Sequence, residues 1–315
     1  MKNCQTVTAV CSSTKKNKSQ TGSRIAGRIV VYIVLTLMSI IWILPILWLL
    51  LQSFSNEPGM QSIQHFIPES FTFNNYIWLF QGVVQDANGV LVYSDFNFLG
   101  MFFNTLLVAV VSCVVSTLFV LLTSFAFSRL RFKARQPMMK VILVLGMFPG
   151  FLSMIVLYQV LKLFNMVPSL IGLIICYIGG AGMGYYICKG FFDTIPKSID
   201  EAAKIDGASQ LKIFWSIILP LAKPIIIYTV LTSFISPWGE YIFSSYIFGD
   251  NSSFYTVAVG LSRMIDIGTG TASNAAIYWK QFCAGSVVIA LPISILFIFM
   301  QKYYVEGVTG GSVKG

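Results

Sequence analysis

Long runs without charged side chains dominate this sequence. The first, Ile29–Leu51, exceeds the ~20 residues that an α-helix needs to cross the hydrocarbon of a bilayer. Only 10% of all residues are charged and 56% are hydrophobic, whereas about a quarter of a soluble domain is charged. The later runs are Met101–Ser128, Val141–Leu161, Ser169–Cys188, a stretch from near Leu221 past Pro237, and Gln281–Gln301. The sequence therefore predicts an all-α membrane protein with six transmembrane helices within residues 29–301.

Lysine and arginine are distributed unevenly between the connections. Residues 1–28 contain six basic and no acidic residues, whereas residues 54–100 contain no lysine or arginine. Five basic residues follow the second run, from Arg129 to Lys140, and are expected to anchor the chain at anionic lipid. Because basic residues collect on the cytoplasmic side, both termini are predicted to be cytoplasmic. The predicted segments are a cytoplasmic arm at 1–28, external loops at 54–100 and 249–278, a cytoplasmic loop at 190–220 and a cytoplasmic tail at 302–315.

A polar segment between two apolar runs, Ser198–Pro220, carries the clearest local signals. Ser198 followed by Glu201 matches a capping box, which predicts a helix from about residue 199 to residue 206. Gly207 fits the left-handed residue that closes a helix, and Ser209 can cap a second helix. Two adjacent alanines leave the backbone of the first helix open to a groove of another protein. The segment is therefore predicted to form a rigid elbow.

The residue types and spacing in this elbow reproduce a known family motif. Glu201-Ala202-Ala203, then Gly207, Ile217 and Leu219-Pro220, resemble the EAA loop of ABC importer permeases. The resemblance implies the type I importer permease fold and a cytoplasmic loop that docks on an ATPase subunit. It assigns ATPase coupling to Glu201, Ala202, Ala203, Asp206, Gly207, Leu219 and Pro220.

The same resemblance implies partners and a location. The chain would form a heterodimer with a second permease subunit in a bacterial cytoplasmic membrane, which it crosses several times. Two ABC ATPase subunits would bind ATP and Mg²⁺, and a binding protein outside the membrane would deliver the solute. This chain would hold no cofactor and would not itself be an enzyme.

Other segments resemble the carbohydrate branch of these importers. Residues 66–76 and 124–132 are similar to the corresponding parts of sugar permeases. The end of the chain is similar to the smaller, G-type subunit of maltose and maltodextrin importers, whose tail contacts the ATPases. The resemblance implies ATPase contacts at Gly311, Ser312, Val313 and Lys314, and binding-protein contacts at Asn251, Ser252, Ser253 and Phe254.

Candidate residues for the solute path are fewer. Tyr158 and Gln159 lie in the third run, whose proline and glycines are typical of a helix that faces a bundle interior or a cavity. Glu240 is an acid in a hydrophobic stretch, where a carboxylate is costly unless it faces water or a partner. It is interpreted either as an interfacial residue or as a solute contact. Gly239 departs from the Trp-Asn-Glu pattern of related permeases, which weakens the transfer of a role to Glu240.

Several kinds of chemistry are not supported. His65 is the single histidine and the six cysteines contain no CxxC pair, so neither a metal site nor a disulfide framework is predicted. The basic residues lack the aromatic neighbours of a nucleic-acid surface. Two alternatives stay open: a permease of the same kind for a non-sugar solute, such as glycerol 3-phosphate or a polyamine, and a secondary transporter that works without an ATPase.

Overall fold

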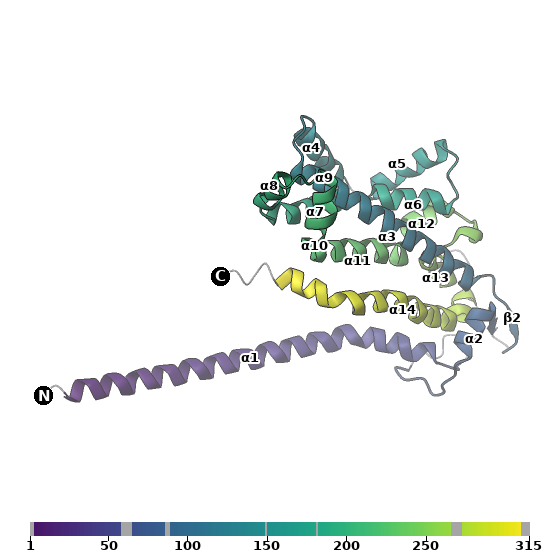
Figure 1. Cartoon of the computed structure of the whole chain (residues 1–315). Coiled ribbons are helices and arrows are strands. Elements are labelled where there is room, and N and C mark those ends of the chain that lie inside the picture. The colour runs from purple at the N-terminus through teal and green to yellow at the C-terminus, as the bar shows by residue number, and fades with distance from the viewer. Residues whose placement is uncertain are drawn as a thin grey trace.

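The structure is a computed structural model that describes residues 3–57, 65–85, 89–148, 150–180, 182–265 and 273–309. Helices account for almost all of the regular structure (Figure 1). Their order is α1 (Asn3–Ser53), α2 (Asn74–Gln81), β1 (Val83–Gln85), β2 (Leu91–Tyr93), α3 (Phe98–Arg129), α4 (Arg135–Gly146), α5 (Gly150–Leu163), α6 (Leu170–Gly179), α7 (Gly182–Thr194), α8 (Lys197–Ile205), α9 (Gln210–Ile213), the π-helical turn η2 (Phe214–Ile218), α10 (Leu219–Leu221), α11 (Lys223–Gly239), α12 (Ile242–Phe248), the 3-10 turn η3 (Ser252–Phe254), α13 (Val257–Met264) and α14 (Ser273–Thr309).

Four helical segments are long and apolar enough to cross a membrane, within the described part of the chain. They are Gly27–Ser53, Phe98–Arg129, Leu170–Thr194 and Ile277–Lys302. A fifth is present if the bent pair Gln210–Leu221 and Lys223–Gly239 counts as one span, with an angle of 85° between its parts. The predicted all-α membrane class is confirmed, whereas the predicted number of six spans is not.

The third apolar run explains this difference. Instead of one continuous helix over Val141–Leu161, the structure has two shorter helices, α4 of 12 residues and α5 of 14 residues. The sequence between them contains Pro149, and proline disrupts a helix because it lacks a backbone donor and its ring clashes with the preceding turn. Neither helix alone reaches the length that a hydrocarbon core requires.

The N-terminal segment also differs from expectation. The basic composition of residues 1–28, with serine, threonine and asparagine between the charges, predicts a disordered arm. Instead, α1 is assigned from Asn3 and continues through Pro45 to Ser53. Once the apolar run has formed a helix, each added residue gains one backbone hydrogen bond without a new nucleation cost. This favours extension of α1 into the basic segment.

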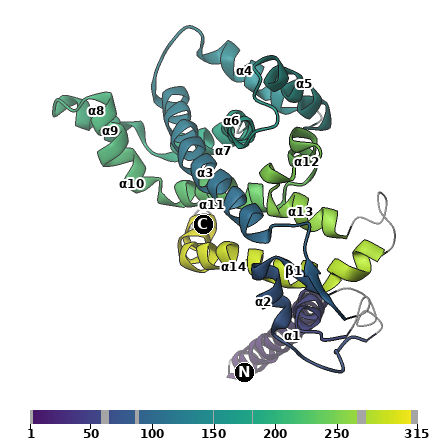
Figure 2. The same cartoon turned by 90° about the vertical axis from the view of Figure 1, so that its right-hand side faces the viewer.

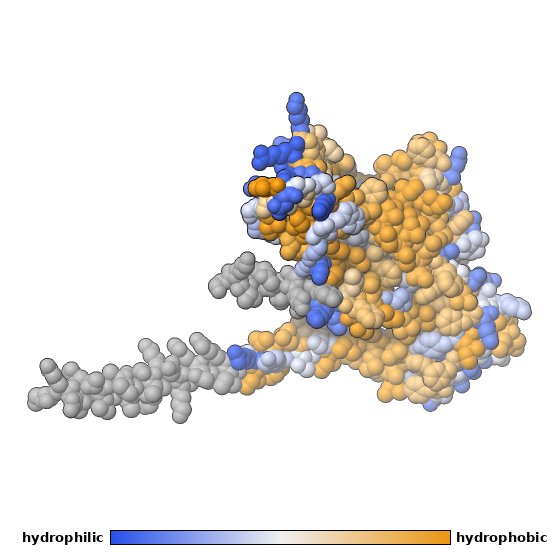
Figure 3. Space-filling view, viewed as in Figure 1, coloured by the Kyte–Doolittle hydropathy of each residue, from blue (hydrophilic) through white to orange (hydrophobic). Residues whose placement is uncertain are grey.

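Helix α3 lies at the centre of the bundle and packs against α6, α7, α11 and α13, while α14 packs against α11 and α1. Figure 2 shows α1 beside α14 at one edge and α4 and α5 at the opposite edge. The rings of Trp48 and Trp279, 5.9 Å apart, join α1 to α14. Large apolar side chains remain exposed over these helices, among them Ile41, Val114 and Ile298. Figure 3 shows this apolar surface between hydrophilic patches at the two ends of the bundle, as a bilayer requires.

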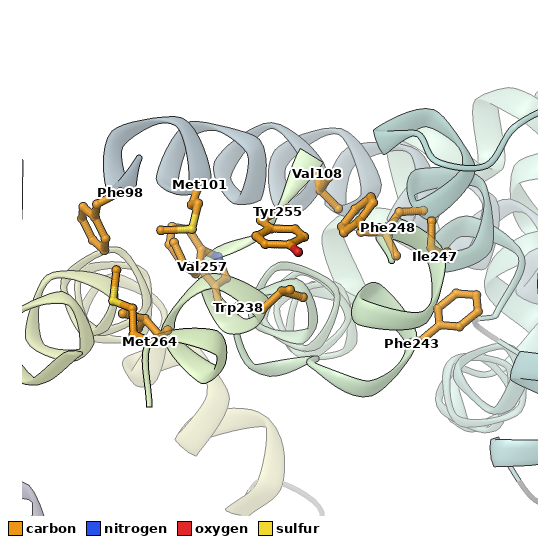
Figure 4. Close-up of a cluster of buried hydrophobic side chains, with 14 of the residues drawn as sticks. Phe98, Met101, Val108, Trp238, Phe243, Ile247, Phe248, Tyr255, Val257 and Met264 are labelled. Carbon is orange, nitrogen blue, oxygen red and sulfur yellow. The ribbon is translucent and has the colours of Figure 1, made fainter. Parts of the chain in front are cut away.

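Two hydrophobic clusters hold the bundle together. One joins α3, α11, α12 and α13, and its members include Phe98, Met101, Trp238 and Val257 (Figure 4). A Cβ added at Gly260 of α13 would lie 1.8 Å from the Met101 sulfur, so any larger residue there would require the Met101 side chain to move. The second cluster lies at the other end of α3, around α7 to α11.

The segment after α1 is more ordered than a simple loop. It contains α2 and the antiparallel hairpin β1–β2, which pairs Val83 with Tyr93 and is a small exception to the all-α class. The Ser53 and Tyr76 hydroxyls lie 2.6 Å apart in a hydrogen bond, and burial raises the pKa of the Tyr76 hydroxyl. The side chain of Asn75 donates to the carbonyls of Ser53 and Ser55. These bonds fix α2 against the end of α1.

Candidate functional site

The elbow at α8 and α9 begins differently from its sequence prediction. Helix α8 starts at Lys197, its N-cap is Pro196, and no side chain caps it. Ser198 is the second residue of the helix, so the predicted capping box with Glu201 is wrong. Pro196 has φ −57° and ψ 132°, which turns the chain into the helix two residues earlier than the serine signal indicated.

The bend after α8 is confirmed in detail. Gly207 has φ +79°, the left-handed conformation that glycine adopts without a steric penalty. The Gly207 amide donates to the Lys204 carbonyl at 3.0 Å, and the Ala208 amide donates to the Ala203 carbonyl at 2.9 Å. This pair of bonds is a Schellman motif, which satisfies the last carbonyls of a helix. The Ser209 hydroxyl then accepts from the Lys212 amide and caps α9, as predicted.

The path from the elbow into the bundle is a chain of short helical pieces. Helix α9 continues through the π-helical turn η2 and α10, which contains Leu219 and Pro220. The Ala222 amide still donates to Ile218 and Leu219, and α11 then leaves at 85°. Leu219 packs against the second hydrophobic cluster, while Pro220 is exposed. Backbone bonds therefore run almost without interruption from the elbow to α11.

Helix α8 has one face toward the protein and one toward solvent. Asp200 and Ala203 are buried, with 5% and 8% of their surface exposed. Glu201, Ala202 and Asp206 are exposed. The expectation that both alanines face a partner is therefore wrong for Ala203, because residues three apart share a helix face and Ala203 follows Asp200 into the core.

Three large apolar side chains of the elbow are exposed among polar neighbours, which was not predicted from the sequence. Ile205 is 87% exposed, and Leu211 and Trp215 are 66% and 55% exposed. We refer to these three residues as the elbow patch. The sequence shows that these residues are hydrophobic. It does not show that they are exposed, because their exposure depends on which face of each short helix packs against α7 and α3.

A buried ion pair ties the elbow to α3. Arg129 Nε lies 2.9 Å from Asp200 Oδ2, and the two side chains are 3% and 7% exposed. A second guanidinium nitrogen of Arg129 donates to the Ile195 carbonyl at 2.9 Å. Arg129 is thus not the lipid anchor that the sequence suggested. Two features of the sequence could have indicated this ion pair. Arg129 is the first charged residue after the uncharged run of α3, and Asp200 lies three residues before Ala203, on the same face of its helix.

A polar contact beside it joins α7 to the same end of α3. The Ser128 hydroxyl donates to Asp193 Oδ1 at 2.6 Å, and Lys189 forms an ion pair with the same carboxylate. Farther along, the Ser124 hydroxyl donates to the Tyr185 carbonyl at 3.1 Å. The end of α3 is therefore connected to both α7 and α8, so a displacement of the elbow acts on α3 as well as on α11.

Comparison with known protein families identifies the family of this chain. Residues 120–310 match the model of the binding-protein-dependent transport system inner membrane component. The chain belongs to this family. Together with the oligosaccharide permeases described next, this match confirms the sequence-based identification of an ABC transporter permease related to carbohydrate importers. The permease has no ATPase activity of its own. It is a multi-pass protein of the inner, or cytoplasmic, membrane.

Relatives cover almost all of the permease. It is 35% identical to the galactooligosaccharides transport system permease protein GanQ of Bacillus subtilis (strain 168) over 90% of this chain and 94% of that protein. It is 33% identical to the maltodextrin transport system permease protein MdxG of the same organism, over 93% and 98%. A chain of a bacterial ABC transporter that imports alginate, an acidic polysaccharide, has the same fold with a TM-score of 0.69, 23% identity, and coverage of 89% and 97%.

The predicted binding-protein segment forms a defined turn at the opposite end of the permease from the elbow. Asn251 precedes η3, its side chain accepts from the Ser253 amide, and Ser252 and Ser253 are exposed while Phe254 is half-buried. The Asn104 side chain donates to the carbonyls of Ser253 and Tyr255, both at 3.1 Å. The turn is therefore held against the start of α3. The predicted tail contacts Gly311, Ser312, Val313 and Lys314 lie outside the described residues.

The predicted path residues make separate contacts in the structure. The Tyr158 ring lies 4.5 Å from that of Tyr246 in α12, and Gln159 is exposed. Glu240 accepts from the amides of Phe243 and Ser244 at 2.6 and 2.9 Å, and from the Ser244 hydroxyl at 2.7 Å. Its carboxylate thus caps α12. This arrangement favours the interfacial, structural interpretation of Glu240 over the solute contact.

Proposed function

We propose that this permease imports a neutral oligosaccharide of the maltodextrin or galactooligosaccharide type, as one half of a heterodimeric channel powered by two ATPase subunits. Similarity to oligosaccharide permeases over nine-tenths of the chain supports the solute class. No single residue determines the assignment of an oligosaccharide as the solute. Family membership and the bent elbow support the proposed assembly.

The single observation that carries the mechanism is the elbow patch on a bent helix pair that is fixed to the bundle. Three large apolar side chains exposed at one polar loop are costly in water and fit a groove in a partner protein. We place the ATPase contact here, with Glu201, Ala202 and Asp206 at its polar edge. Gly207 sets the bend, and Ala203 supports the helix from inside. The tail at Gly311–Lys314 is proposed as a second contact of the ATPases.

Transport then follows as alternating access. When two ATPase subunits close on ATP, they displace the elbow as a rigid body, and α3 and α11 move with it. The ATPases can shift the permease only by holding the elbow more tightly in one state than in the other. The Arg129–Asp200 pair transmits the displacement to α3. The loops 54–100 and 249–278 are proposed to face outward, with Asn251–Phe254 as a contact of a sugar-binding protein.

The test is uptake by the whole complex. The permease, its partner permease, the ATPases and the binding protein are reconstituted into liposomes, with labelled maltotriose, galactotriose, glycerol 3-phosphate or spermidine outside. We expect uptake of at least one trisaccharide that requires both ATP and the binding protein. Uptake of only a charged solute would contradict the sugar assignment, and trisaccharide uptake without ATP would contradict the coupling.

A further inference from the structure

A cavity of about 320 Å³ lies between α3, α6, α7 and α11, at middle depth in the bundle. Ser112, on its wall, follows the start of α3 at Phe98 by about fourteen residues, or about 21 Å at 1.5 Å per residue. The hydrocarbon core of a bilayer is about 30 Å thick. The cavity therefore lies at a depth where lipid cannot satisfy polar groups.

The cavity wall is rich in hydroxyl groups. Its aliphatic hydroxyl side chains are Ser112, Ser116, Thr229, Thr232, Ser233 and Ser236, and none of its described lining residues is charged. Tyr177 and Tyr228 add aromatic rings to the same wall. Polar groups on a lipid-facing surface are costly. This side of the permease is therefore suited to a solute path or to a polar partner helix, and not to lipid.

The hydrogen bonds within the wall show which hydroxyl groups are already satisfied inside the protein. Thr229 and Thr232 each donate to the carbonyl four residues earlier, at 2.8 and 2.9 Å, which is the usual way to satisfy a hydroxyl inside a membrane helix. Ser112 does not: it is 1% exposed and its hydroxyl has no hydrogen-bond partner. A buried unpaired hydroxyl is unfavourable. Its position on the cavity wall points to a ligand that completes its bonding.

We propose that this cavity is a solute subsite of the permease that binds one uncharged, polyhydroxylated unit, a sugar ring, during passage. The inference rests on the proposed function and adds that this subunit itself contacts the sugar. Serine and threonine hydroxyls can both donate and accept, as sugar hydroxyls do, so the two sets pair in many orientations. A phosphate group would lose its hydration here without a positive charge on the described wall in return.

The test removes hydroxyls from the cavity in the reconstituted complex. The variants are Ser112→Ala and the pair Ser112→Ala with Ser233→Ala, and the control is Ser286→Ala. Ser286 also carries a helix hydroxyl, but it lies in α14 and already donates to the Phe282 carbonyl. Loss of one hydrogen bond to the solute corresponds to about a 5-fold effect. We expect maltotriose or galactotriose uptake per ATP hydrolysed to fall about 5-fold for Ser112→Ala and further for the pair, with Ser286→Ala unchanged.

Thermal stability and assembly distinguish a solute role from a structural one. Because Ser112 has no partner inside the protein, Ser112→Ala should leave the melting temperature of the purified complex unchanged or higher. Normal trisaccharide uptake by both cavity variants would overturn the subsite. So would loss of the partner permease during purification with normal uptake per assembled complex, since the hydroxyls would then serve subunit packing. Failure of the unmutated complex to import any trisaccharide would instead refute the proposed function.

Discussion

At the scale of single residues, the Arg129–Asp200 pair is the contact that sequence patterns missed. A positive charge beside a membrane span is most simply explained by lipid, and nothing local indicates that Arg129 turns inward. The structure buries both charged groups within 2.9 Å of each other, and the guanidinium also holds the carbonyl of Ile195. Such a pair contributes little net stability over apolar replacements, but it fixes geometry and is costly to break on one side.

Replacement of one partner should therefore destabilise the permease. Asp200→Asn leaves the buried Arg129 without an opposing charge, and we expect a loss of about 3 kcal/mol, measured as a lower melting temperature of the purified complex. Asp206→Asn is the matched control, because Asp206 lies on the same elbow and is exposed. The two variants would melt at the same temperature if the ion pair had no structural role.

A double replacement extends the same prediction. Arg129→Met with Asp200→Leu removes both charges, and we expect melting to return close to that of the unmutated complex. Uptake per ATP hydrolysed should stay reduced, because two apolar side chains do not hold the Ile195 carbonyl or fix the orientation of α8. Recovery of both properties would show that the pair serves packing alone.

At the scale of elements, some features of the elbow could be predicted from the sequence and others could not. Gly207 and Ser209 were predictable because a left-handed turn and an N-cap depend on local chemistry. Ser198 was misleading because Pro196 starts the helix first. The burial of Ala203 was not predictable, since it depends on Asp200 meeting Arg129, which is about seventy residues away in the sequence.

The elbow patch leads to a prediction about docking. Burial of an isoleucine side chain is worth about 1.5–3 kcal/mol, or roughly 10- to 100-fold in affinity. Ile205→Asp should therefore reduce the amount of ATPase that co-purifies with the permease by at least about 10-fold. The fold should be retained, because Ile205 is 87% exposed.

The neighbouring Lys204 provides the control for this experiment, since it is also exposed on α8 but is not part of the apolar patch. Lys204→Ser should retain ATPase binding. Equal ATPase recovery from Ile205→Asp and Lys204→Ser would show that the elbow patch is not the docking surface. Loss of the partner permease from Ile205→Asp would indicate misfolding, which the melting temperature of the variant measures independently.

At the scale of the whole molecule, hydrophobicity predicted the membrane class and most of the long helices. The uncharged runs at Ile29–Leu51, Met101–Ser128 and Gln281–Gln301 each fall within a long apolar helix of the structure. The run Val141–Leu161 does not, because hydropathy counts apolar residues and does not register that a proline in the run, Pro149, disfavours a continuous helix. The hairpin β1–β2 was missed for the opposite reason, since its strands have three residues each and lie in a polar segment.

The two ends of the bundle differ in composition, which bears on sidedness. The start of α1, the end of α14 and the elbow lie on one side, and the hairpin lies on the other (Figure 1). Residues 1–28, 129–140, 189–223 and 302–315, all at the predicted cytoplasmic side, contain 18 of the 21 basic residues. This favours a cytoplasmic location for the elbow end. An elbow outside the cell could not meet an ATPase, so sidedness is the strictest condition on the proposed mechanism.

Cysteine labelling tests this condition directly. In a variant whose six native cysteines are replaced by serine or alanine, Ser252→Cys should react with a membrane-impermeant maleimide on intact cells. Lys204→Cys should react only after the membrane is permeabilised. Both residues are exposed, so a difference in labelling reports side and not burial. Protection of Ser252→Cys by excess binding protein would further support the contact proposed for η3, whereas labelling of Lys204→Cys on intact cells that keep a cytoplasmic marker unlabelled would refute ATP-driven coupling through the elbow.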